Sequence, residues 1–207
     1  MLKTFIDFIM HLDESLGAIV QTYGFWSHFL IFFVIFLETG VVVTPFLPGD
    51  SLLFAAGVLS AQGFLDPILL FLLLSAAAIL GDTVNYWLGY RVGKKIFERD
   101  RPLINKNYLT RAENFYGQHG KRAIIIARFL PIIRTFVPFI AGVGKMDYRN
   151  FIGYNIIGGI LWVGLFVFGG YFFGNVPFIK ENFSLTIVAI IIISLIPPII
   201  GFWRHRK

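Results

Sequence analysis

The chain has 207 residues, of which 57% are hydrophobic and 14% are charged, and its mean hydropathy is +0.74. A soluble domain of this length carries about 25% charged residues, so this chain has too little polar surface to face water on every side. The composition excludes an ordinary soluble domain and predicts one all-α, polytopic membrane domain over residues 1–207.

Charge and cysteine content narrow the function classes further. The net charge is +6, but the Lys and Arg residues lie between apolar stretches, where cytoplasmic loops carry them, rather than in a basic domain. This distribution argues against nucleic acid as a partner. The absence of Cys excludes disulfides, thiolate metal sites and thiol nucleophiles.

Residues 1–22 are predicted to form an interfacial amphipathic helix. Their apolar side chains recur at helical spacing, and acidic residues interrupt the segment, unlike the apolar region of a signal peptide. With Lys3 as its only Lys or Arg, this helix is expected on the outer side of the membrane.

The apolar segment 25–62 is predicted to enter the membrane, break and return as a first re-entrant hairpin. Glu38 lies before the break, at which Pro45 and Pro48 disfavour a continuous helix. Asp50 or the serine after it is expected to cap the returning helix.

The segment after the first hairpin reads as a transmembrane span over residues 65–90, with Asp82 inside it. Basic residues follow the span, which places its end on the cytoplasmic side. Residues 98–120 are polar and are predicted to be a cytoplasmic connector that contains a short amphipathic helix.

Residues 123–143 repeat the pattern of the first hairpin with bases in place of acids. Arg128 and Arg134 lie in apolar sequence, which Pro131 and Pro138 break, and basic residues flank both ends. Because basic flanks stay in the cytoplasm, a second re-entrant hairpin that opens on the cytoplasmic side is predicted.

Two uncharged segments, 151–174 and 183–203, are predicted to be the remaining spans, with the basic C-terminus in the cytoplasm. Each hairpin precedes a span, which favours a weak inverted repeat of the kind that many transporters use to form a site near the midplane. Non-helical backbone at membrane depth is tolerated where it is buried in protein or lines a wet cavity. The two hairpins are therefore expected to share a central cavity.

Four charges within these hairpins are the main functional signal: Glu38, Asp50, Arg128 and Arg134. Each charge at bilayer depth costs about 2.5–3.5 kcal/mol, so the four must face one another or water. Structural salt bridges that hold the hairpins together are one interpretation. Function is the favoured one, because charged residues inside a membrane usually mark a substrate or ion pathway.

The functional interpretation divides the roles between bases and acids. Arg128 and Arg134 are predicted to bind a phosphate group, because guanidinium binds phosphate through two parallel hydrogen bonds and keeps its charge in apolar surroundings. Glu38 and Asp50 are predicted to take up and release protons or another ion, close to the Arg pair. Uptake of a proton by either acid would change the charge that faces the bound anion.

Other polar residues carry weaker signals. Asp82 is a candidate for lining the same cavity, with a hydrogen bond to a neighbouring helix as the alternative. Asn155 is expected to hydrogen-bond another helix and Trp162 to pack within the bundle. The chain has no P-loop, HExxH or GxSxG motif and its four His are scattered, so no enzymatic activity, metal or cofactor is predicted.

Three stretches between residues 36 and 162 resemble the DedA family, a bacterial group that shares the VTT (SNARE-associated) domain: FLETGVVVTPFLPGDSLLFAAG, GDTVNYWLGYRVG and FYGQHGKRAIIIARFLPIIRTFVPFIAGVGKMDYRNFIGYNIIGGILW. The resemblance implies that the acidic pair, Glu38 and Asp50, and the arginine pair, Arg128 and Arg134, are functionally required. It also implies a bacterial inner-membrane protein with opposed re-entrant hairpins. Members of the family are linked to undecaprenyl phosphate recycling, to phospholipid flipping or scrambling, to transport that depends on proton-motive force, and to envelope stress or antimicrobial-peptide resistance.

The residues and the resemblance together predict a flippase for undecaprenyl phosphate or a glycerophospholipid, coupled to a proton or sodium gradient. A proton-coupled small-cation antiporter and a structural membrane assembly factor are the alternatives. The predicted partners are a membrane lipid and protons or sodium. A homodimer is left open, because no interface can be read from the sequence.

Overall fold

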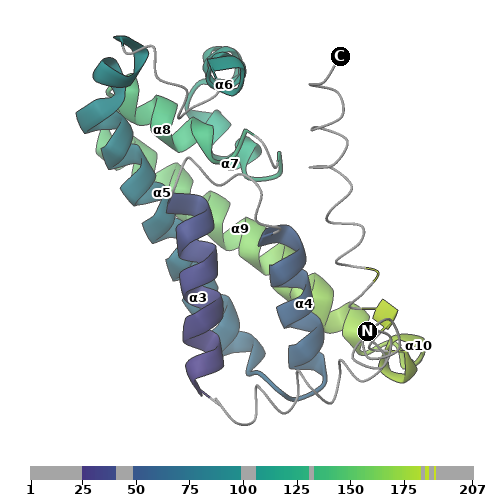
Figure 1. Ribbon diagram of the computed structural model, residues 1–207. Coiled ribbons are helices and arrows are strands. Elements are labelled where there is room, and N and C mark those ends of the chain that lie inside the picture. Colours follow the sequence, from purple (N-terminus) through teal and green to yellow (C-terminus); the bar gives the residue numbers. More distant parts are fainter. Residues whose placement is uncertain are drawn as a thin grey trace, which may run out of the picture. The chain divides into compact units, whose positions relative to one another are not determined.

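The computed structural model describes residues 25–40, 49–98, 106–130, 133–182, 185–186 and 189. These ranges are helical and turn structure without a β-strand, which confirms the all-α prediction (Figure 1). The helices are α3 (Phe25–Gly40), α4 (Gly49–Ala61), α5 (Pro67–Glu98), α6 (Lys106–His119), the 3-10 helix η1 (Gly120–Arg122), α7 (Ala123–Ala127), α8 (Phe136–Val143), α9 (Tyr148–Gly174) and α10 (Pro177–Glu181). The predicted helix 1–22, the proline-rich break of the first hairpin and nearly all of the span 183–203 lie outside the described residues.

In the part of the chain that the structure describes, two helices are long and apolar enough to cross a membrane, and they fall where spans 65–90 and 151–174 were predicted. These are Pro67–Arg91 within α5 and Tyr148–Gly174, which is α9. At 1.5 Å per residue, the 27 residues of α9 are about 40 Å long, against about 30 Å for the hydrocarbon core of a bilayer.

The starts of two helices differ from the predicted ones. Asp147 accepts a hydrogen bond from the backbone N–H of Asn150 at 3.1 Å, and α9 therefore begins three residues before the predicted 151. α4 begins at Gly49, so Asp50 lies within the first turn rather than at the cap, where its charge favours the helix N-terminus.

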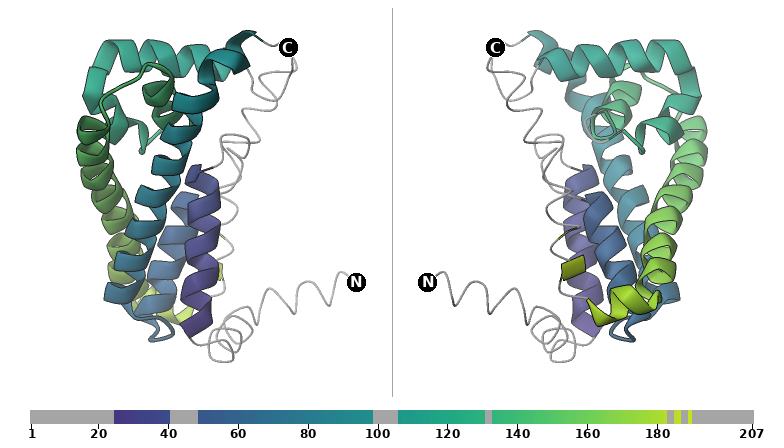
Figure 2. Two further views of the ribbon diagram at one scale, coloured as in Figure 1. Left: turned by 90° about the vertical axis from the view of Figure 1, so that its left-hand side faces the viewer. Right: turned by 90° about the vertical axis from the view of Figure 1, so that its right-hand side faces the viewer.

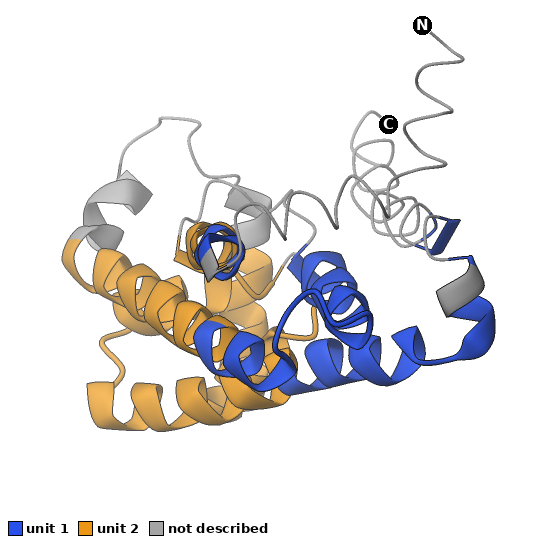
Figure 3. Cartoon of the chain, turned by 90° about the horizontal axis from the view of Figure 1, so that it is seen from below, with its two compact units in different colours: residues 1–31, 48–73, 164–207 blue, residues 32–47, 74–163 orange. Residues whose placement is uncertain are grey.

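The chain divides into two compact units, which are coloured separately in Figure 3 and are described here one at a time. Unit 1 comprises residues 1–31, 48–73 and 164–207, and unit 2 comprises residues 32–47 and 74–163. α9 belongs to both, because its first part lies in unit 2 and its last part in unit 1.

In unit 1, α4 lies against the last part of α9 through two glycines. A Cβ on Gly57 would collide with the carbonyl oxygen of Val167, and a Cβ on Gly170 would collide with that of Phe54. Glycine at both positions lets the two backbones approach each other closely, as in many membrane helix pairs.

In unit 2, α8 lies against α5 through a contact of the same pattern. A Cβ on Gly142 would collide with the carbonyl oxygen of Tyr86, and a Cβ on Gly89 would collide with that of Phe139. In both units each helix offers a carbonyl and, three residues later, a glycine to its partner. The second arm of each predicted hairpin thus contacts a long helix in the same way.

The core of unit 2 surrounds Tyr86 and supports the region that carries the two arginines. The Tyr86 hydroxyl donates a hydrogen bond to the carbonyl of Met146 at 2.6 Å, and its ring stacks on Phe151 with centroids 4.4 Å apart. α6 covers this core beside α7 and α8 through Ala112 and Phe115 (Figure 2). The short amphipathic helix predicted within the connector 98–120 corresponds to α6.

Candidate functional site

The predicted second hairpin, 123–143, contains two short helices, α7 and α8, with both arginines between them. Arg128 follows the last turn of α7, and Arg134 lies in the turns that precede α8. Both residues are buried, with 3% and 8% of their surface exposed. That these helices form a re-entrant hairpin in a membrane stays a prediction.

Arg134 forms an ion pair with Glu38, which lies near the end of α3. The side chains of Arg134 and Glu38 are 8% and 1% exposed, so both partners of this pair are removed from water. The contact joins an acid of the first predicted hairpin to a base of the second, as the cost of isolated charges in a membrane requires.

Arg128 forms an ion pair with Asp82 of α5, with Nη2 and Oδ2 separated by 2.6 Å. Both side chains are 4% exposed. The sequence predicts Asp82 as a candidate for lining the cavity, with a hydrogen bond to a neighbouring helix as the alternative. The structure places it at the cavity and adds Arg128 as its partner.

Asn155 of α9 holds the Arg128 guanidinium from a second side. Its Oδ1 accepts a hydrogen bond from Arg128 Nη2 at 2.5 Å, and its Nδ2 donates to the carbonyl of Ile79 at 3.0 Å and the hydroxyl of Thr83 at 3.3 Å. Asn155 therefore bonds to a neighbouring helix as expected, and it also orients the arginine.

Trp162 of α9 contacts both arginines. The guanidinium carbons of Arg128 and Arg134 lie 5.9 and 5.1 Å from the centroid of its ring. Because the indole is 1% exposed, these cation–π contacts occur away from water, where such contacts are stronger. Trp162 packs within the bundle as predicted, and the structure adds its contact with both charges.

Asn85 is a site-building residue that sequence reasoning missed. Its Nδ2 donates to the carbonyl of Thr39 at 3.2 Å and to that of Thr135 at 2.6 Å, and the residue is fully buried. It thereby ties the end of α3 to the turn before α8. Its spacing of three residues from Asp82 puts both on one face of α5, which was the available signal.

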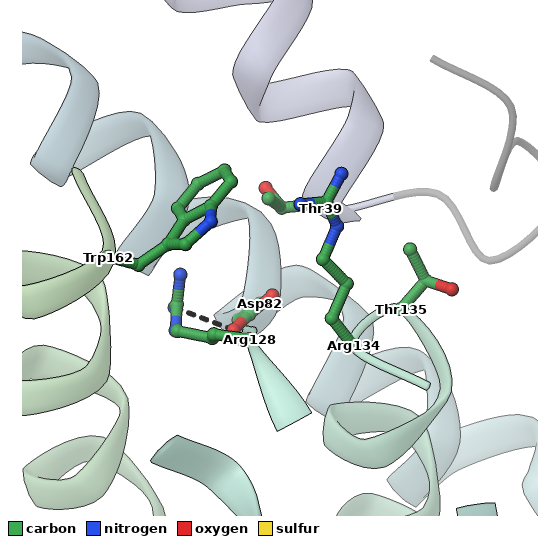
Figure 4. Close-up of a pocket in the computed structure, with 6 residues that line it drawn as sticks. All are labelled: Thr39, Asp82, Arg128, Arg134, Thr135 and Trp162. Carbon is green, nitrogen blue, oxygen red and sulfur yellow. Dashed lines mark ion pairs between the residues drawn. The ribbon is translucent and has the colours of Figure 1, made fainter. Parts of the chain in front are cut away.

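A small cavity lies at the centre of these contacts (Figure 4). It is lined by Thr39, Asp82, Arg128, Arg134, Thr135 and Trp162. Figure 4 shows the Asp82 and Arg128 side chains meeting beside the indole ring. With a volume of about 10 Å³, the cavity has room for about one water molecule.

Asp50 is the predicted site residue that belongs to the other compact unit. It lies in α4 and therefore in unit 1, whereas Glu38, Arg128 and Arg134 lie in unit 2. Its predicted role in ion coupling stays a prediction. Within the described residues, no group of His, Cys, Asp or Glu side chains is arranged to hold a metal ion.

The site pairs each arginine with a carboxylate. Two arginines face two carboxylates, and amide, hydroxyl and indole groups complete the surroundings. An arrangement of this kind can bind an anion if a carboxylate gives up its arginine, and it can exchange protons if a carboxylate is neutralised.

Comparisons with known proteins place the chain among membrane proteins. A family model described as the VTT domain matches residues 47–172. Protein DedA of Escherichia coli (strain K12) is 47% identical over 205 residues, which cover 98% of this chain and 94% of that protein. The inner membrane protein YghB of the same strain is 37% identical over 175 residues, 82% of this chain and 78% of that protein. No solved structure matches the chain.

A mycobacterial relative agrees with this placement. The uncharacterized membrane protein ML0287 of Mycobacterium leprae is 42% identical over 175 residues, 84% of this chain and 78% of that protein. The VTT match covers more than half of the chain and includes both arginines and Asp82. Because of that match and of the 47% identity to a bacterial relative over nearly the full length, the chain belongs to the DedA family of VTT-domain membrane proteins.

Proposed function

We propose that this protein is a transporter that moves a phosphate-bearing lipid, undecaprenyl phosphate or a glycerophospholipid, across the bacterial inner membrane. The observation that carries the proposal is the convergence of Arg128 and Arg134 on one buried cavity, each held by a carboxylate. Guanidinium groups match phosphate oxygens in geometry as well as in charge. The two carboxylates occupy the place that a phosphate would take.

The cavity size implies that the described state is closed. A space for about one water molecule cannot hold a phosphate group with its four oxygens. Transport therefore requires an opening step in which at least one ion pair separates and the turn between α7 and α8 moves. A gradient of protons or sodium ions would supply the driving force by neutralising the released carboxylates.

Apolar side chains next to the arginines favour a lipid over a free anion. Ile126, Phe129 and Leu130 flank Arg128 in sequence, and each is 37–40% exposed. On α5, Leu80 and Leu88 are exposed by 49% and 44%. Such surfaces fit lipid tails, so a headgroup could reach the arginines while its chains stay in hydrocarbon.

The proposed membrane arrangement follows the predicted one. Multiple spans with two opposed re-entrant hairpins would place the arginines at membrane depth. The Gly57–Gly170 and Gly142–Gly89 contacts share one three-residue offset, as an internal repeat would produce. No enzymatic step is part of the proposal.

The test is lipid movement in liposomes. Purified protein would be reconstituted with labelled undecaprenyl phosphate or labelled phosphatidylethanolamine, with and without a pH gradient. Arg134→Ala should lose transport by at least about tenfold, the effect of losing a hydrogen bond to a charged group. Arg111→Ala, which removes an exposed arginine of α6, is the matched control and should transport normally.

The outcomes separate the candidate functions. Movement of one lipid by wild type and by Arg111→Ala, lost in Arg134→Ala at equal folded amounts, supports the proposal and identifies the substrate. No lipid movement by folded wild type rejects it. Sodium or proton flux without lipid would then support the antiporter, which the two buried carboxylates favour. No flux of either kind leaves the assembly factor, in which the ion pairs are structural.

A further inference from the structure

Asp82 differs from Glu38 in its relation to the cavity. Both acids pair with an arginine of unit 2, but Asp82 contributes to the cavity lining, which the other five residues given above complete. A phosphate group that enters the cavity therefore meets the Asp82 carboxylate directly. The cluster must respond to that second negative charge, because like charges in a buried site are costly.

The hydrogen bonds of Arg128 allow Asp82 to leave without disrupting the arginine. Within the described residues, its polar contacts are made by Nη2, which lies near Asp82, Asn155 and the carbonyl of Ala78 at 2.6, 2.5 and 3.4 Å. Nη2 carries two hydrogens, so the other two acceptors can satisfy it. Within the same residues, Nε has no hydrogen-bond partner and is a ready donor for an anion.

The negative charge of the anion then favours entry of a cation with it. Two ion pairs lie at the cavity, Asp82 of α5 with Arg128 and Glu38 of α3 with Arg134. The α9 residues that contact Arg128 beside Asp82, Asn155 and Trp162, are uncharged. A bound phosphate diester adds one negative charge to these groups, and such a charge is expensive to bury without a partner.

From these contacts we propose that Asp82 is the residue that takes up a proton when a phosphate headgroup binds Arg128. The proposal rests on the proposed function. A proton from water binds a carboxylate oxygen of Asp82 as the ion pair with Arg128 separates, and the phosphate oxygen replaces that carboxylate beside the guanidinium. The proton offsets the negative charge of the headgroup, and its loss on the other side of the membrane restores the ion pair and expels the headgroup.

The experiment counts protons taken up on binding. Full-length protein in detergent would be titrated calorimetrically with short-chain phosphatidylglycerol in two buffers that differ in ionisation enthalpy. A diester is the suitable probe because a monoester has a second pKa of about 6 and would itself take up protons. Wild type should take up about one proton per lipid, and its affinity should rise about tenfold for each unit of falling pH.

The variants decide which residue holds that proton. Asp82→Asn keeps an oxygen for Arg128 but cannot titrate, so it should still bind the lipid with no proton uptake and no pH dependence. Glu113→Gln, which changes an exposed acid of α6, should behave as wild type. Unchanged proton uptake in Asp82→Asn, or loss of uptake in Glu38→Gln instead, would overturn the assignment.

Further measurements distinguish a failure of the Asp82 assignment from a failure of the proposed function. If Asp82→Asn does not fold, wild type alone still decides, because binding without proton uptake rejects the proton-linked role. Asp82→Glu, which keeps the carboxyl group, should retain uptake. Binding of inorganic phosphate but not of phosphatidylglycerol, or binding of neither probe, would contradict transport of a glycerophospholipid instead.

Discussion

Arg128 illustrates how much of the site depends on single side chains. Its guanidinium contacts an acid, an amide and an indole ring at the same time. Lysine would supply the charge but not the planar group that stacks on Trp162 and spreads its donors over several directions. The site is therefore built for arginine in particular.

Arg128→Lys should lower lipid transport by at least about tenfold while the protein remains folded, because a point charge cannot replace the fork of donors. The measurement is the initial rate of lipid movement in liposomes at matched amounts of folded protein. Arg111→Lys is the matched control at an exposed position of α6. Full activity of Arg128→Lys would count against phosphate binding through the guanidinium.

At the scale of helices, the two glycine contacts hold the second arm of each predicted hairpin against a long helix. α4 contacts α9 in unit 1, and α8 contacts α5 in unit 2. Because backbone atoms meet at these points, neither contact has a side chain that could move aside to admit a larger residue. The turn that carries both arginines is therefore anchored just beyond Arg134.

Gly142→Ala should destabilise the protein by about 1–3 kcal/mol, the usual cost of overpacking, because its Cβ would meet the carbonyl oxygen of Tyr86. The unfolding midpoint of purified protein in detergent measures this effect. Gly153→Ala in α9 is the control, since a Cβ there meets no atom within 4 Å among the described residues. Equal midpoints for the two variants would show that the close contact does not limit stability.

At the scale of the whole molecule, a closed cavity and the proposed transport function together require at least one other conformation. The described state keeps Thr39 only 4% exposed beside the arginines. A transporter must expose this position to one side of the membrane in part of its cycle. The lack of native Cys makes such exposure measurable, because an introduced thiol is the only one in the chain.

Thr39→Cys should react slowly with a membrane-impermeant maleimide at rest and several times faster when a phosphate lipid and a pH gradient are both present. The population shift toward an open state is the reason, and the labelling rate in vesicles is the measurement. Thr110→Cys on α6, already exposed, should label at one rate in all conditions. A constant slow rate for the Thr39→Cys variant in vesicles that actively transport lipid would contradict an opening at this cavity.

Prediction from sequence succeeded where a local pattern is governed by one dominant energy term. The all-α class and the two long helices follow from runs of apolar residues, and the family follows from motifs around Glu38, Arg128 and Arg134. Helix ends were less predictable, since a capping residue such as Asp147 moves a boundary by a turn. The re-entrant geometry of the hairpins stays a prediction.

By itself the sequence determined that this protein belongs in a membrane, because long apolar runs and a shortage of charge are properties of the composition. It also determined that the arginines within apolar segments need partners, because an isolated charge in hydrocarbon is costly. Only the tertiary structure decided which partners they have. Arg128 pairs with Asp82 and Asn155 rather than with an acid of the first hairpin. That choice depends on how α5, α7 and α9 approach one another, and contacts between distant segments leave no local pattern in the chain.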